Sequence, residues 1–156
     1  MSSRTRSIAK GSLYMNYHDR GAGDIFVAKT LLAPGGNPNG DESVYDIAAY
    51  HTQQGIEKEL KHILHDILGD DENSHSFKTH NLPDLIGQVE AHGISVPEEI
   101  VDMAFDLNDW EAATRYSHGS VAKSEEISEA IEAYDRFVDY VKNDVEPLFS
   151  DIDTDA

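Results

Sequence analysis

The sequence predicts an all-α protein, an up-and-down antiparallel bundle of about five helices. Apolar residues recur at intervals of three and four along most of the chain, which is the spacing of one buried helix face. Alternating runs rich in valine, isoleucine and threonine, which would indicate strands, do not occur. Glycine, proline and small polar residues divide the chain at four breaks: 33–43, 69–80, 91–97 and 117–124.

The first two helices are expected at about 10–33 and at 43–68. The first is supported by Ile25, Val27, Ala28, Leu31 and Leu32. In the second, Ser43 and Asp46 have the spacing of a capping box, and Gly69 is a natural stop. Its apolar stripe consists of Ala49, Ile56, Leu60, Ile63, Leu64 and Ile67.

Two further helices are expected at 81–92 and 95–116. Asn81 is a suitable N-cap for the shorter one. Ser95 and Glu98 have capping-box spacing at the start of the longer one, and a proline lies between them in its first turn.

The last helix, 124–145, has the most regular apolar spacing, and Ser124 is its expected N-cap. We therefore predict one helical domain over residues 1–145, followed by an acidic tail over 146–156.

Charge and composition limit the classes of function. Thirty acidic residues against twelve basic ones give a formal net charge of −18, which argues against non-specific nucleic-acid binding. The chain has no cysteine, so it has neither disulfides nor thiolate chemistry. No apolar run approaches the roughly 20 residues of a membrane span, and we expect a cytoplasmic protein.

The second predicted helix carries a polar stripe against this acidic background. Its members share one helix face: His51, Gln54, Lys58, Lys61 and His65. The stripe is either a solvated face with local pairing or a surface for an anion, a nucleotide or a partner protein. Gly55 lies within it, and a mid-helix glycine costs about 1 kcal/mol, which a close helix crossing or a dimer contact would offset.

Arg115 and His118 are the candidates for phosphate chemistry. Arg115 would contact a phosphate and His118 would act as acid or base. The alternative is a structural arginine that pairs with Glu111, four residues earlier, or interacts with the helix C-terminus.

Eight histidines raise the question of a metal site. His62 and His65 are three residues apart, but no HExxH motif or four-ligand spacing accompanies them. We therefore expect neither a metal nor another cofactor.

Two segments together form a recognisable pattern, which consists of His51, Gln53, Gln54, Glu57, Lys58, Leu60 and Lys61, then Thr79, His80, Leu82 and Leu85. This pattern resembles the HEPN domain (higher eukaryotes and prokaryotes nucleotide-binding). A later stretch, Leu107, Asn108, Ala113, Arg115 and Tyr116, is similar to that of some members.

The resemblance implies a helical bundle that often forms homodimers. It also implies partnership with a minimal nucleotidyltransferase, as in toxin–antitoxin pairs, or metal-independent ribonuclease activity. The ribonuclease motif of the family is an arginine followed after four to six residues by a histidine, whereas only two residues separate Arg115 from His118.

Three functions stay open. The first is a non-catalytic HEPN module that binds a nucleotide, an anion or a partner protein, with His51, Gln54, Lys58, Lys61 and Arg115 as the binding residues. The second is a metal-independent endoribonuclease that uses Arg115 and His118. The third is an acidic structural or antitoxin-like protein that binds a basic partner.

Overall fold

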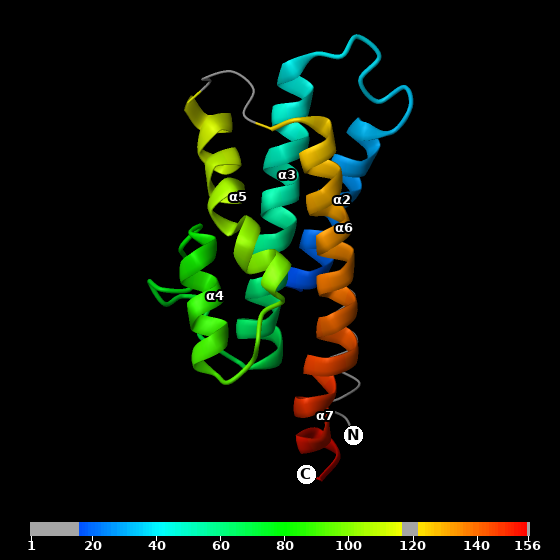
Figure 1. Ribbon diagram of the computed structural model, residues 1–156. Coiled ribbons are helices and arrows are strands. Elements are labelled where there is room, and N and C mark those ends of the chain that lie inside the picture. The colour runs from blue at the N-terminus through cyan, green and yellow to red at the C-terminus, as the bar shows by residue number, and fades with distance from the viewer. Residues whose placement is uncertain (1–15, 117–121, 156) are drawn as a thin grey trace.

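The computed structural model describes residues 16–116 and 122–155, and all regular structure in these two ranges is helical. The all-α fold class is thus confirmed. Helix α3 occupies the middle of the bundle, with α2 and α6 on one side and α4 and α5 on the other (Figure 1). In chain order the elements are α2 (Tyr17–Leu32), α3 (Glu42–Lys61), the π-helix η1 (His62–Ile67), α4 (Leu82–Ala91), α5 (Glu98–Tyr116), α6 (Ser124–Tyr140), the π-helix η2 (Val141–Val145) and α7 (Glu146–Asp155).

Helices α2 and α3 form a closely packed hairpin. A Cβ atom added to Gly55 would lie 2.6 Å from both Cδ1 and Cγ1 of Ile25, and one added to Gly21 would lie 3.0 Å from the Gly55 carbonyl oxygen. Two glycines therefore let the helix backbones approach each other. Of the explanations for Gly55, the structure shows a close helix crossing within the chain.

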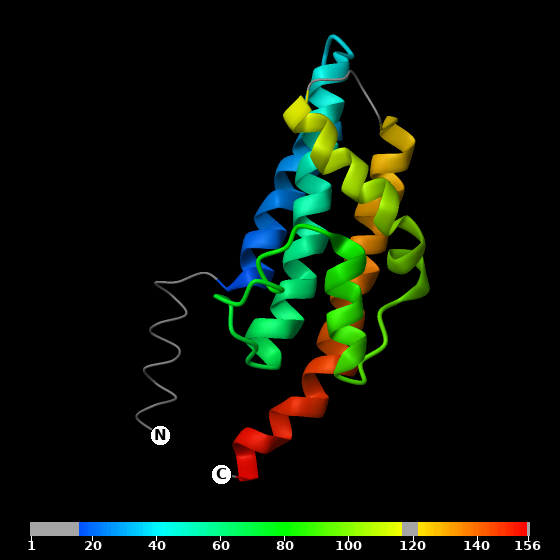
Figure 2. The same cartoon turned by 90° about the vertical axis from the view of Figure 1, so that its left-hand side faces the viewer.

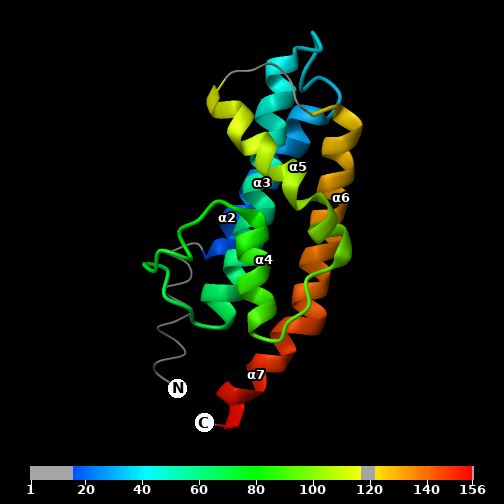
Figure 3. The same ribbon diagram turned by 60° about the vertical axis from the view of Figure 1, so that its left-hand side comes forward.

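The core lies around α3, which contacts α2, α4, α5 and α6. Its apolar stripe is buried as predicted from residue 49 onwards, and Ile56, Leu60, Ile63 and Leu64 have no solvent exposure. Helices α4 and α5 cover one side of α3 (Figure 3).

Helix α4 departs from the antiparallel order. His80 lies against Glu57 in the middle of α3, whereas His92, after α4, contacts Asp70 just beyond η1. Helix α4 thus runs in the same direction as α3. The polar segment between η1 and α4 is long enough to return along α3, since α4 itself is only about 15 Å long.

Most helix boundaries match the predicted ones within a few residues, but α2 begins at Tyr17, with Asn16 as its N-cap, rather than at about residue 10. Three predicted caps are wrong. Helix α3 begins at Glu42 rather than after Ser43, and α6 has Lys123 rather than Ser124 as its N-cap. Helix α5 begins at Glu98, so Ser95 lies outside it and does not cap it. Asn81 does cap α4, because its Oδ1 accepts a hydrogen bond from the Asp84 amide.

The end of the second predicted helix differs in its hydrogen bonding. Residues 62–67 form a π-helix, and the Leu68 amide donates to the Ile63 carbonyl at 2.9 Å, one residue further back than in an α-helix. Gly69, with φ of 80°, ends it as predicted.

The predicted boundary at residue 145 falls inside a continuous helical run. Helix α7 follows η2 directly and extends the line of α6 beyond the bundle (Figure 2). Phe149 packs partly against the core, whereas Leu148 is exposed. Among the described residues, no helix combines the length and the apolar character that crossing a membrane requires.

Candidate functional site

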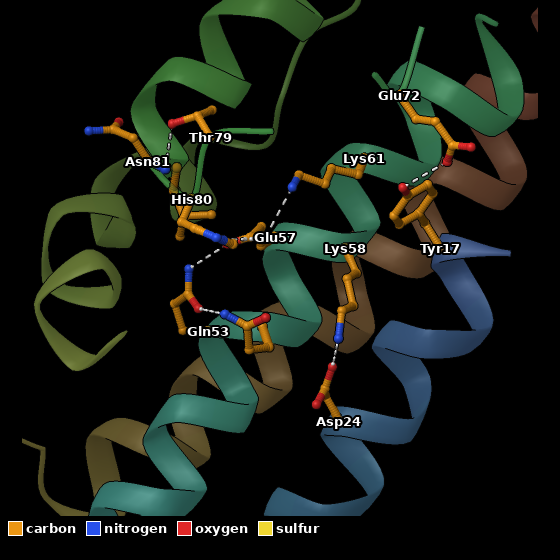
Figure 4. A network of polar contacts seen from close by, with 12 residues as sticks. Tyr17, Asp24, Gln53, Glu57, Lys58, Lys61, Glu72, Thr79, His80 and Asn81 are labelled. Carbon is orange, nitrogen blue, oxygen red and sulfur yellow. Dashed lines mark hydrogen bonds and ion pairs between the residues drawn. The ribbon is translucent and has the colours of Figure 1, made fainter. Parts of the chain in front are cut away.

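Helix α3 carries an unusual number of buried polar side chains, which we call the α3 polar network. Burying a polar group costs free energy unless it is hydrogen-bonded, so the partners of these groups determine what the helix face can do. The network lies between α2 and the segment that precedes α4 (Figure 4). Its buried members on α3 are Thr52, Gln53, Gln54, Glu57, Glu59 and Lys61.

Asp24 on α2 accepts hydrogen bonds from two side chains of α3. His51 Nδ1 donates to Asp24 Oδ1 at 2.8 Å, and Lys58 Nζ donates to Asp24 Oδ2 at 2.6 Å. All three side chains are partly buried. The close α2–α3 crossing at Gly55 brings these groups together, and one carboxylate satisfies both neighbours.

Glu57 holds the other half of the network. Its side chain is 3% exposed, and it accepts hydrogen bonds from Gln53 Nε2 at 3.1 Å and from His80 Nδ1 at 3.1 Å. Lys61 Nζ lies 3.4 Å from Glu57 Oε2, and Gln54 Nε2 donates to Gln53 Oε1 at 2.7 Å. Glu57 therefore joins the middle of α3 to the residues that precede α4.

Lys61 is a buried part of this arrangement. Its Nζ lies 5.2 Å from the centre of the Phe77 ring, and only 7% of the residue is exposed. Both a carboxylate and an aromatic ring thus compensate the charge that burial would otherwise penalise.

The polar stripe of the second predicted helix is therefore not a free cationic surface. Its residues do lie on one helical run, but His51 and Lys58 are bound to Asp24, and Lys61 is bound to Glu57. Gln54 is 8% exposed and is hydrogen-bonded inside the protein. The partner of His51 and Lys58 is distant in sequence, whereas Lys61 pairs with Glu57 four residues earlier on the same helix. Ligand binding by these residues stays a prediction.

Arg115 and His118 cannot be joined into a site from this structure. Arg115 lies in α5, but its side chain falls outside the described part of the chain, and His118 falls outside it altogether. The proposed pairing of Arg115 with Glu111 and the proposed phosphate contact thus both stay predictions.

A second polar group, which the sequence analysis did not identify as a site, links α2, α3, η1 and α7. His18 Nδ1 donates to Glu59 Oε1 at 2.8 Å. His62 Nδ1 donates to Asp66 Oδ2 at 2.8 Å, and its Nε2 donates to Glu146 Oε1 at 3.2 Å. The four-residue spacing of His62 and Asp66 is visible in the sequence, but the approach of Glu146 is not.

Both ring nitrogens of His62 face carboxylate oxygens, and this geometry favours the protonated ring, because only that form can donate from both nitrogens. Burial is the largest influence on its pKa and lowers it, but the hydrogen bond to Asp66, the nearby Glu59 and the bond to Glu146 together raise the pKa above 6.5. The hydrogen bond to Glu59 likewise raises the pKa of His18.

Neither polar group forms a metal centre. Within residues 16–116 and 122–155, no three histidine, aspartate or glutamate side chains are placed to hold a metal ion together. The carboxylates instead accept hydrogen bonds from histidine, lysine and amide groups, as in an internal hydrogen-bond network.

Comparison with known proteins assigns the chain to a family. The HEPN domain family matches residues 39–144, a range that starts just before α3 and ends within η2. Searches of curated proteins and of solved structures found no match. Since the matched range is more than half of the chain and contains most of the bundle, this protein belongs to the HEPN domain family.

Proposed function

We propose that this HEPN domain is a non-catalytic module that acts by binding a partner protein. One observation carries the proposal: the basic side chains of α3 are already paired with the protein's own carboxylates. The face with the strongest sequence signal for ligand binding therefore serves mainly to hold the bundle together. The surface that we propose to contact a partner is therefore the acidic outer surface of the protein.

A nucleotide on the α3 polar network is less favoured for a physical reason. Its phosphates would have to replace Asp24 beside Lys58, or Glu57 beside Lys61. Releasing either carboxylate would leave a partly or fully buried charge without its partner, at a cost of several kcal/mol for a buried charge. The negative charge of the whole chain adds repulsion.

The ribonuclease alternative depends on Arg115 and His118. RNA cleavage needs a base for the 2′-hydroxyl and a cation for the phosphorane, and both must converge on one phosphate. With two residues between them instead of four to six, the two side chains leave the backbone in different relative directions. We therefore keep this activity as an alternative to be tested.

The partner class that we propose first is a minimal nucleotidyltransferase, as in toxin–antitoxin systems, because the family resemblance implies it. The third function left open by the sequence is an acidic structural protein that binds a basic partner. It would use the same surface and would differ only in the identity of the partner. A homodimer is a further prediction, which the molar mass from light scattering would test.

The test compares three ligands on the full-length protein. Calorimetric titration with ATP, incubation with RNA in EDTA, and titration with a minimal nucleotidyltransferase from the same genome are run side by side. We expect binding only to the protein. ATP binding that Lys58→Ala weakens, or RNA cleavage that His118→Ala abolishes, would overturn the proposal.

A further inference from the structure

The outer face of α5 exposes apolar side chains that the bundle leaves uncovered. Phe105 is 72% exposed and Val101 is 39% exposed, one turn apart on the same side of the helix. The opposite side of α5 is buried through Ile100, Ala104 and Leu107. The helix thus exposes an apolar pair on the side directed away from α3.

Four carboxylates lie along one flank of this apolar pair. Glu98, Asp102, Asp106 and Asp109 are all exposed, and at 100° per residue they lie on the same outer half of the helix as Phe105. No ion pair among the described residues involves any of them, whereas the neighbouring Glu99 is paired with Arg136 on α6. We call these residues, with Val101 and Phe105, the α5 outer face.

The dimensions of the α5 outer face suit a helix. From residue 98 to residue 109 it is about 16 Å long, which corresponds to about three turns. The apolar pair occupies one turn and the acids beside it extend over three turns, which suits an amphipathic helix that lays its apolar face on this pair and places charges of opposite sign along the flank that faces the acids.

We propose that the α5 outer face is the docking surface for a basic amphipathic helix of a partner protein. The inference rests on the proposed function and gives that function a location. Leucine-like side chains of the partner would cover Phe105 and Val101, and its lysines or arginines would pair with the unpaired carboxylates.

Charge complementarity decides between this occupant and others. A second copy that docked through the same face would bring four more carboxylates against these four. Nucleic acid and anionic membranes are repelled for the same reason. A basic helix alone satisfies both the apolar pair and the acids.

A defined peptide pair tests the proposal. The probe is a synthetic helical peptide with leucines along one face and lysines on its flanks, and its control is a scrambled peptide of identical composition. Binding to the full-length protein is measured by calorimetry, and amide shifts in NMR spectra locate it. We expect the ordered peptide to bind about tenfold more tightly than the scrambled one, with shifts confined to α5.

Matched variants distinguish binding at the α5 outer face from non-specific attraction to the acidic surface of the protein. Phe105→Ser should remove the tenfold preference, whereas Phe26→Ser, which alters an equally exposed phenylalanine on α2, should retain it. Asp102→Asn with Asp106→Asn should weaken binding and reduce its salt dependence. An equal charge change on exposed residues of α6, Glu125→Gln with Glu129→Gln, should have a smaller effect.

The outcomes distinguish failure of the location from failure of the function. Equal binding of the two peptides, or equal effects of Phe105→Ser and Phe26→Ser, would overturn the α5 location. If the nucleotidyltransferase still binds Phe105→Ser with wild-type affinity, the location is again wrong but the partner-binding function stands. If the whole protein binds ATP and no protein, the function itself fails. Unchanged urea midpoints of the variants would confirm that they fold.

Discussion

Replacing Gly55 with alanine should destabilise the protein by about 2 kcal/mol, although alanine is the better helix former. Gly55 lies in the middle of α3, where the α2 backbone crosses closely. Helix propensity alone would favour the alanine by about 1 kcal/mol. The new methyl group would, however, lie 2.6 Å from two atoms of Ile25 and 3.2 Å from the Gly21 carbonyl oxygen.

The size of the effect follows from these contacts. Overpacking a core costs about 1–3 kcal/mol, and we take the upper end because Ile25 is 2% exposed and has little space to move into. Subtracting the propensity gain of about 1 kcal/mol leaves a net loss of about 2 kcal/mol. The assay is urea unfolding followed by circular dichroism, in which the midpoint should fall with an unchanged slope.

Gly87 provides the matched control. It lies inside α4, and a Cβ atom added there would meet no atom within 4 Å. Gly87→Ala should therefore stabilise the protein by up to about 1 kcal/mol through helix propensity. Combining Gly55→Ala with Ile25→Val should cost less than the sum of the two single changes. A Gly55→Ala protein as stable as the wild type would refute the crossing as the reason for this glycine.

Three further predictions concern the polar groups. Because the folded pKa of His62 is raised above 6.5, the stability that this residue contributes is fully present below about pH 6.5 and is lost as the pH rises through the folded pKa. The unfolding free energy should fall as the pH rises through the folded pKa, and His62→Gln should reduce this fall. A pH dependence that His62→Gln leaves unaltered would contradict the contribution assigned to His62. Asp24→Ala should cost about 2 kcal/mol in urea unfolding, because it leaves His51 and Lys58 without their acceptor. Lys58→Met should cost less than Asp24→Ala, because Asp24 keeps its bond to His51, and the reverse order would show that Asp24 is not the centre of the group. Glu57→Gln should destabilise the protein through the loss of the charge that faces Lys61 and His80, and a midpoint equal to the wild type would show that Glu57 is dispensable.

The helices and their buried faces could be predicted because both depend on local spacing. The apolar stripe from Ala49 to Leu64 follows the helical period, and the structure buries it. Caps were less predictable, since Ser43 is acceptable by type but α3 begins at Glu42, with Asp41 at the N-cap position. The π-helical end of this segment has no compositional signal that separates it from an α-helix.

The partners of His51, Lys58 and His80 could not be predicted because they are distant in sequence, whereas Lys61 and Glu57 have the four-residue spacing of a pair on one helix. Asp24 precedes His51 by 27 positions, and His80 follows Glu57 by 23 positions. No periodicity within one helix indicates such contacts. The stripe on α3 was therefore visible as a row of polar residues, but whether it was free or paired depended on how α2 and the segment before α4 pack against it.

The excess of acidic residues explains why the basic side chains of α3 are paired inside the protein, and it is the reason why we place the proposed binding surface at unpaired acids. With 30 acidic and 12 basic residues, a base that enters the interior readily finds a carboxylate, as Lys58 and Lys61 do. The converse does not hold, because even complete pairing of the bases would leave 30 − 12 = 18 carboxylates without a lysine or arginine partner. Most of these surplus charges are solvated and need no explanation. Around Phe105 the surplus acids lie beside exposed apolar side chains, and the basic amphipathic helix that we propose as the partner would match this combination with its own positive charges and its own apolar face.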